Sequence, residues 1–314
     1  YYDIGYTIAT LIKEELPYKL KVLTDKSLGS FENCKLLKKK KVEFAIIQND
    51  TPINFENVNK TINYDPGIRS VMPLYPEVIF ILYKPGAKPR TLRELIVGRR
   101  IGLGPVTSGT ARLMKILFNE FGIKENEYKH VYTSFGENKI GNRIDVSCAV
   151  TGYNNSRIQK MLKQGAKIFS IDDIALAKRG SAVDGFCLKY PHARTFIIPR
   201  NTYGKSPSNP VLTLAVDSIL VTSVHVPTDI VYNITKTIME KRQILINKNK
   251  LLSSLHEKFD KSVINFPLHE GARQYFERNK PSFFEKYSEM IGVFFSIFLA
   301  FIGLGASFFK WRKQ

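Results

Sequence analysis

Residues 104–117, GPVTSGTARLMKIL, place two glycines and three hydroxyl residues directly before an apolar run. The side chains of Leu113, Ile116, Leu117 and Phe121 recur at helical spacing, and Gly122 is a stop signal. The preceding residues 99–104, RRIGLG, have the pattern of a short strand. The stretch is therefore predicted to turn from a strand into a helix.

Two roles fit this turn. The first amides of a helix have no partner within the helix, and the dipole is positive there, so the turn suits an anion. The simpler alternative is a capped helix with Ser108 or Thr110 as its N-cap. An NTPase phosphate loop is excluded, because Thr110 stands where G-x-x-x-x-G-K-[ST] requires lysine.

A second turn of the same design lies at residues 24–37, TDKSLGSFENCKLL. We expect a strand over residues 20–25, Ser30 as the N-cap, and a helix that begins at Phe31. Two such turns, far apart in the sequence, favour two α/β lobes that present helix ends to one cleft.

Between the two turns, residues 42–50, VEFAIIQND, have the pattern of a buried parallel strand that ends in polar residues. Gln48 and Asp50 would then lie where α/β folds bind ligands. An Asn/Asp turn, with Asp50 capping the next segment, is an equally good interpretation.

The chain of 314 residues has a formal net charge of +19, but its lysines and arginines are spread along the sequence. The tightest run, residues 38–41, follows a predicted helix and is interpreted as a solvated face. Because no nucleic-acid-binding motif accompanies the charge, we expect no nucleic-acid partner.

The sequence also has no recognisable metal-binding or catalytic motif. The three cysteines form no C-x-x-C pair, and the five histidines are far apart, so no metal site is expected. No Ser-His-Asp order, nucleophile elbow or intact dinucleotide fingerprint occurs. We therefore expect no catalytic residues, no cofactor and no enzyme activity.

Residues 290–309, MIGVFFSIFLAFIGLGASFF, carry no charge and match the length that a helix needs to span a bilayer. The tail KWRKQ that follows places Trp311 at the interface and favours a cytoplasmic carboxyl end. The rest of the chain would then lie outside the cytoplasm.

Six stretches occur in the order typical of one known family. They are YYDIG (1–5), GSFENCKLL (29–37), FAIIQND (44–50), IGLGPVTSGTARLMKILFNEFGI (101–123), IPRNTYG (198–204) and VLTLAVDSILVTSVHVPTDIVYNITKTIME (211–240). Over residues 1–275 the chain resembles the TAXI family, the solute-binding subunits of tripartite ATP-independent periplasmic (TRAP) transporters. Two departures are the missing strand before YYDIG and the membrane-spanning segment, since family members are commonly soluble or lipid-anchored.

The resemblance implies an α/β fold, a two-lobed periplasmic binding protein of type II-like form, here followed by a C-terminal transmembrane helix. The expected parts are lobe 1 at residues 1–80 and 208–245, lobe 2 at 81–207, a helical segment and tether at 246–288, a membrane helix at 289–309, and a cytoplasmic tail at 310–314. We expect the chain to cross between the lobes near residues 76–84 and to return near 200–216.

The implied function is a membrane-anchored receptor in the periplasm, in the inner (cytoplasmic) membrane, that passes a small carboxylate to a TRAP-type permease. Glutamate, glutamine and 2-oxoglutarate are the ligands that the resemblance suggests. A membrane-tethered sensor with the same fold is the alternative.

The candidate ligand-binding residues come from both predicted lobes. They are Tyr2, Ser30, Asn33, Gln48, Asp50, Thr107, Ser108, Gly109, Thr110, Thr151, Gly152 and Tyr203. The turn at Thr107–Thr110 would hold a carboxylate, and Asp50 could accept from an α-ammonium group. For Tyr2 and Tyr203, a place in the core or hinge is an equally good interpretation.

Overall fold

The computed structural model describes residues 2–23, 27, 29–51, 67–137, 139–281, 287–299 and 302. The chain divides into two compact units, Tyr1–Arg273 and Gln274–Gln314. The helices are α1 Tyr2–Glu15, α2 Ser30–Lys38, α3 Leu92–Ile96, α4 Gly109–Glu120, α5 Ser156–Lys163, α6 Ala182–Lys189, α7 Thr228–Glu240, α8 Arg242–Lys248 and α9 Glu270–Glu277. Short 3-10 helices are η1 Glu125–Glu127, η2 Ile174–Leu176, η3 Lys250–Ser254 and η4 Lys261–Val263.

The strands form one eight-stranded sheet in the order β1-β8-β2-β5-β3-β4, with β6 on β2 and β7 on β8. Their bounds are β1 Phe44–Gln48, β2 Ile68–Tyr83, β3 Arg100–Gly102, β4 Lys129–Val131, β5 Val146–Gly152, β6 Lys167–Ile168, β7 Ala193–Ile198 and β8 Val211–Ser223. Strands β2 and β8 are long, with 16 and 13 residues, and pair antiparallel through the middle of the first unit.

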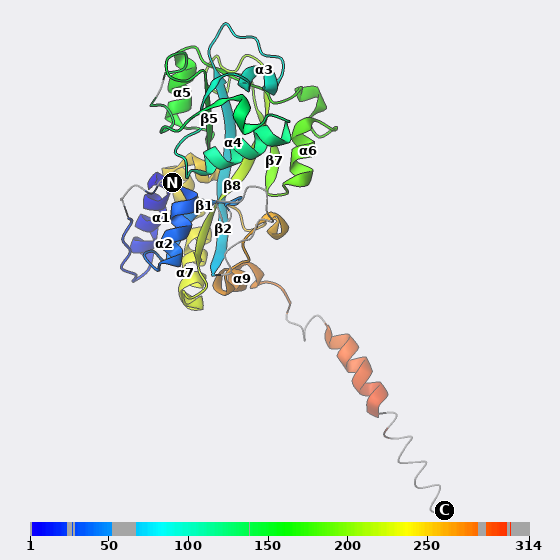
Figure 1. Cartoon of the computed structure of the whole chain (residues 1–314). Coiled ribbons are helices and arrows are strands. Elements are labelled where there is room, and N and C mark those ends of the chain that lie inside the picture. The colour runs from blue at the N-terminus through cyan, green and yellow to red at the C-terminus, as the bar shows by residue number, and fades with distance from the viewer. Residues whose placement is uncertain are drawn as a thin grey trace, which may run out of the picture. The chain divides into compact units, whose positions relative to one another are not determined.

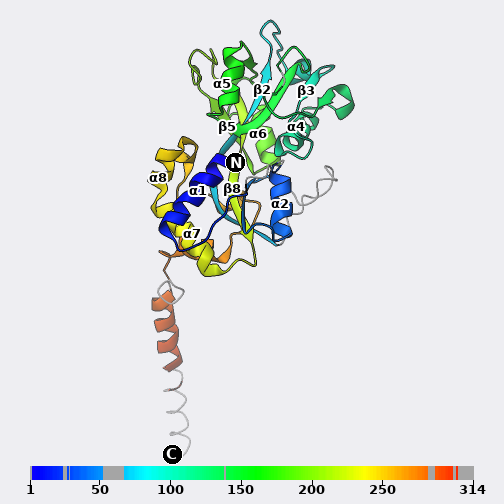
Figure 2. The ribbon, with the colours of Figure 1, turned by 90° about the vertical axis from the view of Figure 1, so that its left-hand side faces the viewer.

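The two long strands change partners near their middle. The first half of β8, Val211–Val216, pairs with β7, and the second half, Ser218–Thr222, pairs with β1. On β2, pairing with β5 begins at Glu77. Figures 1 and 2 show α1, α2 and α7 around one end of β2 and β8, and α3, α4, α5 and α6 around the other.

Alternation along β2 explains how the second helix group covers both faces of the sheet. Ile79 and Ile81 pack on one face with α3, α4 and α6, whereas Phe80 and its neighbours Val78 and Leu82 pack on the other face with α5. Successive side chains of a strand point to opposite faces, so a continuous apolar run fills two cores at once. A third core joins α2 to β1 and β8.

The predicted crossings between the lobes can be compared with the strand pairing. On β2 the partner strand changes at Glu77, near the start of the predicted crossing at residues 76–84. On β8 it changes between Val216 and Ser218, at the end of the predicted return at residues 200–216. The sheet runs unbroken through both halves of the first unit, so the division into two lobes stays a prediction. The lobe limits stay a prediction.

Two local expectations are wrong. Residues 20–23 form no strand, and residues 24–25 of that expected strand lie outside the described part. Strand β1 is buried as expected at Ile46–Gln48, but it pairs antiparallel with β8 rather than parallel. A run of buried apolar residues does not by itself give the direction of the neighbouring strand.

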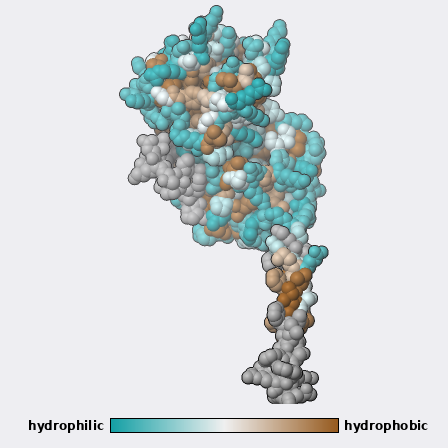
Figure 3. Space-filling model, turned by 90° about the vertical axis from the view of Figure 1, so that its right-hand side faces the viewer, coloured by the Kyte–Doolittle hydropathy of each residue, from teal (hydrophilic) through white to brown (hydrophobic). Residues whose placement is uncertain are grey.

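In the second unit, residues 287–299 are helical. The apolar side chains of this helix are exposed, with Phe294 at 66% and Phe295 at 62% of full exposure (Figure 3). Among the described residues, no helix has the length and apolar character needed to cross a membrane. Of the predicted span at 290–309, residues 300, 301 and 303–309 lie outside the described part, as does the tail at 310–314.

Candidate functional site

The amino-terminal ends of α2 and α4 meet in the structure, as the two glycine-containing turns predict. A Cβ built on Gly29 would lie 3.6 Å from the Cα of Ser108. Both helix ends carry the positive end of a dipole, so their meeting creates a site that favours an anion. We call this region the helix junction and define it by Gly29, Ser30, Gln48, Asp50, Glu77 and residues 107–112.

The caps of the two helices differ from each other. Ser108 is the N-cap of α4 and accepts a hydrogen bond from the Ala111 amide at 3.1 Å. For α2 the expected N-cap Ser30 is wrong by one residue, because Gly29 occupies that position with φ of 126°. The left-handed backbone there favours glycine, and Ser30 instead accepts from the Gln48 amide at 3.0 Å.

Gln48 lies at the centre of the helix junction and is 2% exposed. Its Nε2 donates to the Glu77 carboxylate at 2.7 Å, which fixes its Oε1 as an acceptor. That Oε1 has no hydrogen-bond partner within the described residues. It lies so close to Gly109 that a Cβ at this glycine would be 1.6 Å from it. The junction is therefore closed over Gln48.

A buried ion pair joins the two helix groups. Arg112 of α4 donates from one guanidinium nitrogen to Asp50 Oδ2 at 3.0 Å and to the Asp50 carbonyl oxygen at 2.6 Å. The side chains of Arg112 and Asp50 are only 10% and 1% exposed. Sequence reasoning missed Arg112, since it stopped at the glycine-containing turn. Arg112 follows the cap Ser108 by four residues, so the two side chains lie on the same face of the helix, and this spacing was the signal available in the sequence.

Several polar groups at the helix junction lack partners. Among the described residues, the buried atoms Asp50 Oδ1, Gln48 Oε1 and Thr107 Oγ1 have no hydrogen-bond partner. The amides of Gly109 and Thr110, in the first turn of α4, likewise have no acceptor among the described residues. Buried groups of this kind cost free energy unless they are paired, so the junction has both acceptors and donors ready for a ligand.

Other candidate residues have structural partners. Asn33 donates to the Ile46 carbonyl at 2.8 Å, Thr110 Oγ1 accepts from the Val150 amide at 3.2 Å, and Thr151 Oγ1 accepts from Asn155 at 2.9 Å. These side chains tie elements together. The Thr110 hydroxyl only accepts in its bond, so its O–H hydrogen and its backbone amide are the groups that could bind a ligand. The Tyr2 side chain lies outside the described part.

Tyr203 and Gly152 are placed by packing. The Tyr203 hydroxyl donates to the Tyr153 carbonyl at 2.5 Å, and its ring packs near Phe80. Tyr203 is partly buried, and its place in the wall of a ligand site stays a prediction. Gly152 pairs with Glu77 across β5 and β2, and a Cβ there would be 2.6 Å from Leu251 Cδ2.

Ser108→Ala should lower the free energy of unfolding by about 1 kcal/mol, because the Ala111 amide loses its cap. Ser181, the N-cap of α6, gives a comparison cap far from the helix junction. Urea unfolding followed by circular dichroism would measure both variants. An unchanged stability for Ser108→Ala would contradict the capping role.

Histidine protonation should make the chain less stable in acid. Burial is the first cause that lowers the pKa of His192, and the Arg112 charge lowers it further while Asp50 opposes. A histidine with a lowered folded-state pKa contributes stability above its unfolded pKa of about 6.5, and this contribution is lost as the pH falls. The fall in unfolding free energy between pH 7.5 and 5.5 should be smaller in His192→Gln than in the unmodified chain. Equal falls in the two proteins would refute this.

The chain matches the NMT1-like family over residues 1–279. It belongs to this family. Among solved structures, a Xanthomonas citri protein with bound ATP has a TM-score of 0.51 at 8% identity, and the match covers 88% of this chain and 89% of that one. The two chains therefore share a fold, which is the α/β fold expected from the sequence.

Two further solved structures are similar at lower scores. One is the periplasmic aliphatic sulphonate binding protein of Escherichia coli, with a TM-score of 0.43, 12% identity, and coverage of 89% of this chain and 80% of that chain. The other is the substrate binding protein of an amino acid ABC transporter, with a TM-score of 0.44, 11% identity, and coverage of 81% and 88%. Membership of the TAXI family stays a prediction from the sequence.

Proposed function

We propose that this NMT1-like chain is a solute receptor that closes its two helix groups around a small charged molecule. The observation that carries the proposal is the set of buried polar atoms, where the ends of α2 and α4 meet, that have no hydrogen-bond partner among the described residues. A packed protein core leaves few such atoms, whereas a binding cleft needs them.

The chemistry of the helix junction favours a small carboxylate that also carries a donor. The free amides of Gly109 and Thr110 and the positive ends of two helices would bind the carboxylate. Asp50 Oδ1 and Gln48 Oε1 would accept from an ammonium or amide group. Glutamate and glutamine meet both demands, and a 2-oxoglutarate-like acid meets the first.

The C-terminal segment supports a membrane-anchored form of this receptor. Residues 290–309 carry no charge, and the basic tail that follows favours a cytoplasmic end. We propose that the binding unit lies in the periplasm at the inner membrane and passes its solute to a TRAP-type permease, as the resemblance to TAXI proteins suggests. A tethered ligand sensor is the second candidate, which the anchor fits equally well.

A thermal-shift screen of the full chain in non-ionic detergent tests the proposal. The panel contains the common amino acids, dicarboxylates and 2-oxo acids. A ligand at about a hundred times its dissociation constant should stabilise the fold by roughly 2.7 kcal/mol. A screen in which no member of this panel stabilises the chain would refute the small-carboxylate assignment.

A further inference from the structure

A cavity lies away from the helix junction, at the far end of β2. It has a volume of about 430 Å³ and is lined by the end of β2, the loop that follows it, α3, and the starts of β3 and β5. Tyr83 at this cavity is six residues along β2 from Glu77 at the junction. At about 3.3 Å per residue, the two sites are roughly 20 Å apart.

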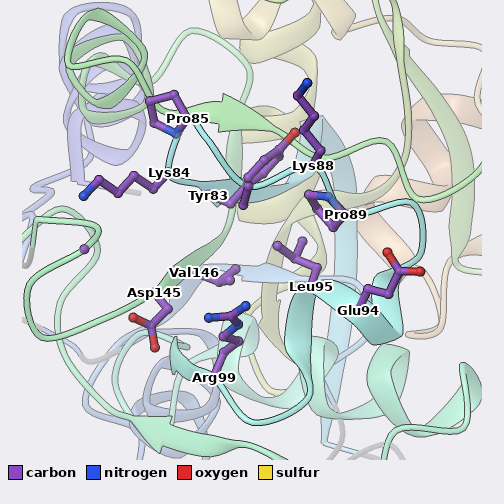
Figure 4. Close-up of a pocket in the computed structure, with 12 residues that line it drawn as sticks. Tyr83, Lys84, Pro85, Lys88, Pro89, Glu94, Leu95, Arg99, Asp145 and Val146 are labelled. Atoms are coloured by element: carbon purple, nitrogen blue, oxygen red, sulfur yellow. The ribbon is translucent and has the colours of Figure 1, made fainter.

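The cavity is bordered by three cations, Lys84, Lys88 and Arg99. Within the described part of the chain, the side chains of Lys84, Lys88 and Arg99 make no hydrogen bond and no ion pair. Figure 4 shows Arg99 turned into the cavity beside Leu95 and Val146, while the two lysines extend from the rim. Such side chains can bend toward a bound anion.

The acidic groups at the cavity are already engaged. Asp145 accepts three hydrogen bonds from Arg100, one from its amide and two from its guanidinium, at 2.7–3.1 Å. Glu94 accepts from the Arg90 amide at 2.8 Å. The carboxylate of Asp145 is hydrogen-bonded to Arg100 and also feels the charge of Arg99. The charges left to meet a ligand are mainly positive.

Part of the cavity lining is apolar. Tyr83, Pro85, Pro89, Leu95 and Val146 supply ring faces and aliphatic groups around the cations. An apolar lining with a few charged groups is typical of a small-molecule site. Arginine and tyrosine both stack on flat ring systems.

We infer that this cavity binds an organic anion that carries several negative charges on a flat apolar body, independently of the solute at the helix junction. Lys84, Lys88 and Arg99 would neutralise its charges, and Tyr83 with the two prolines would contact its body. A site within one helix group, away from the junction, could be occupied whether the junction is open or closed.

The probe is 8-hydroxypyrene-1,3,6-trisulfonate, which is flat, fluorescent and too polar to enter a detergent micelle. Its fluorescence anisotropy with the full chain should show one saturable site. Lys84→Gln/Lys88→Gln/Arg99→Gln should weaken binding at least tenfold, whereas the charge-conserving Lys84→Arg/Lys88→Arg should retain it. The control Lys38→Gln/Lys39→Gln/Lys41→Gln removes the same charge from the α2 end and should leave binding unchanged.

Thermal unfolding checks that each variant is folded, and all exchanged side chains are exposed or solvent-facing. Benzene-1,3,5-tricarboxylate should displace the probe more strongly than inorganic triphosphate, since only the former has a flat apolar body. Glutamate at saturation should not displace it. No saturable binding, equal loss in the two triple variants, or equal displacement by triphosphate would overturn the inference.

Discussion

Arg112→Met should weaken solute binding by a factor of about 10² to 10³. In the closed helix junction, the variant leaves the Asp50 carboxylate buried at 1% exposure without its cation. Removing one partner of a buried pair costs about 3–5 kcal/mol. When the junction is open, water would solvate the Asp50 carboxylate. Most of the free-energy cost therefore arises when the two helix groups close around the solute, and it lowers the solute affinity. Isothermal titration with the solute found by the screen measures the loss.

The matched control for Arg112 is Arg93→Met. Arg93 pairs with Glu127 on the surface, and its side chain is 55% exposed. Exposed pairs of this kind contribute about 0–1 kcal/mol, so this variant should bind the solute normally. In the double variant Asp50→Asn/Arg112→Met the loss should be smaller than the sum of the two single losses, because the groups interact. Equal affinities for Arg112→Met and Arg93→Met would show that the ion pair does not hold the junction closed.

Gly109→Ala should weaken solute binding by about 1–3 kcal/mol, the usual cost of adding a methyl group to a packed site. The new Cβ would be 1.6 Å from Gln48 Oε1, so the Gln48 side chain or the whole junction must move. Movement of Gln48 also breaks its bond to Glu77. Titration measures the affinity, and small-angle scattering should show a more open molecule.

Two comparisons isolate the clash at Gly109. Gly185 in α6 has open space around its missing Cβ, so Gly185→Ala should bind solute normally. In a Gln48→Ala background the obstructing oxygen is gone, and the further change Gly109→Ala should cost little. If Gly109→Ala costs as much in that background as in the unmodified chain, the contact with Gln48 is not the cause.

Local signals in the sequence predict the helix ends well. The cap at Ser108 and the start of α4 depend on residues within one helical turn. Such signals are short in range, because a cap is satisfied by amides three residues away. The meeting of α2 and α4 followed from recognising the same signal twice.

Long-range pairings could not be predicted in this way. The contact between Arg112 and Asp50 joins residues 62 positions apart, and no local pattern specifies it. The same holds for the antiparallel pairing of β1 with β8, which depends on the path of the chain between them. Hydroxyl residues such as Thr110 and Tyr203 have typical ligand-binding chemistry, but no local pattern predicts the tertiary hydrogen bonds that their side chains make.

A disulfide across the helix junction tests most directly whether the solute enters by its opening. A Cβ on Gly29 would lie 3.9 Å from the Ser108 Cβ, close to the mean of about 3.8 Å in disulfides. The variant Gly29→Cys/Ser108→Cys is made with Cys187→Ser, which removes the only cysteine that is not buried. The reduced form carries the same substitutions without the disulfide. It therefore controls for backbone strain at position 29 and for the loss of the Ser108 cap.

We predict that the oxidised variant, prepared without solute, takes up no solute on the time scale of titration, and that reduction restores binding. Solute added before oxidation should be retained through dialysis and released by reductant. Uptake by the oxidised variant at the same rate and affinity as by the reduced variant would contradict a solute site enclosed between α2 and α4.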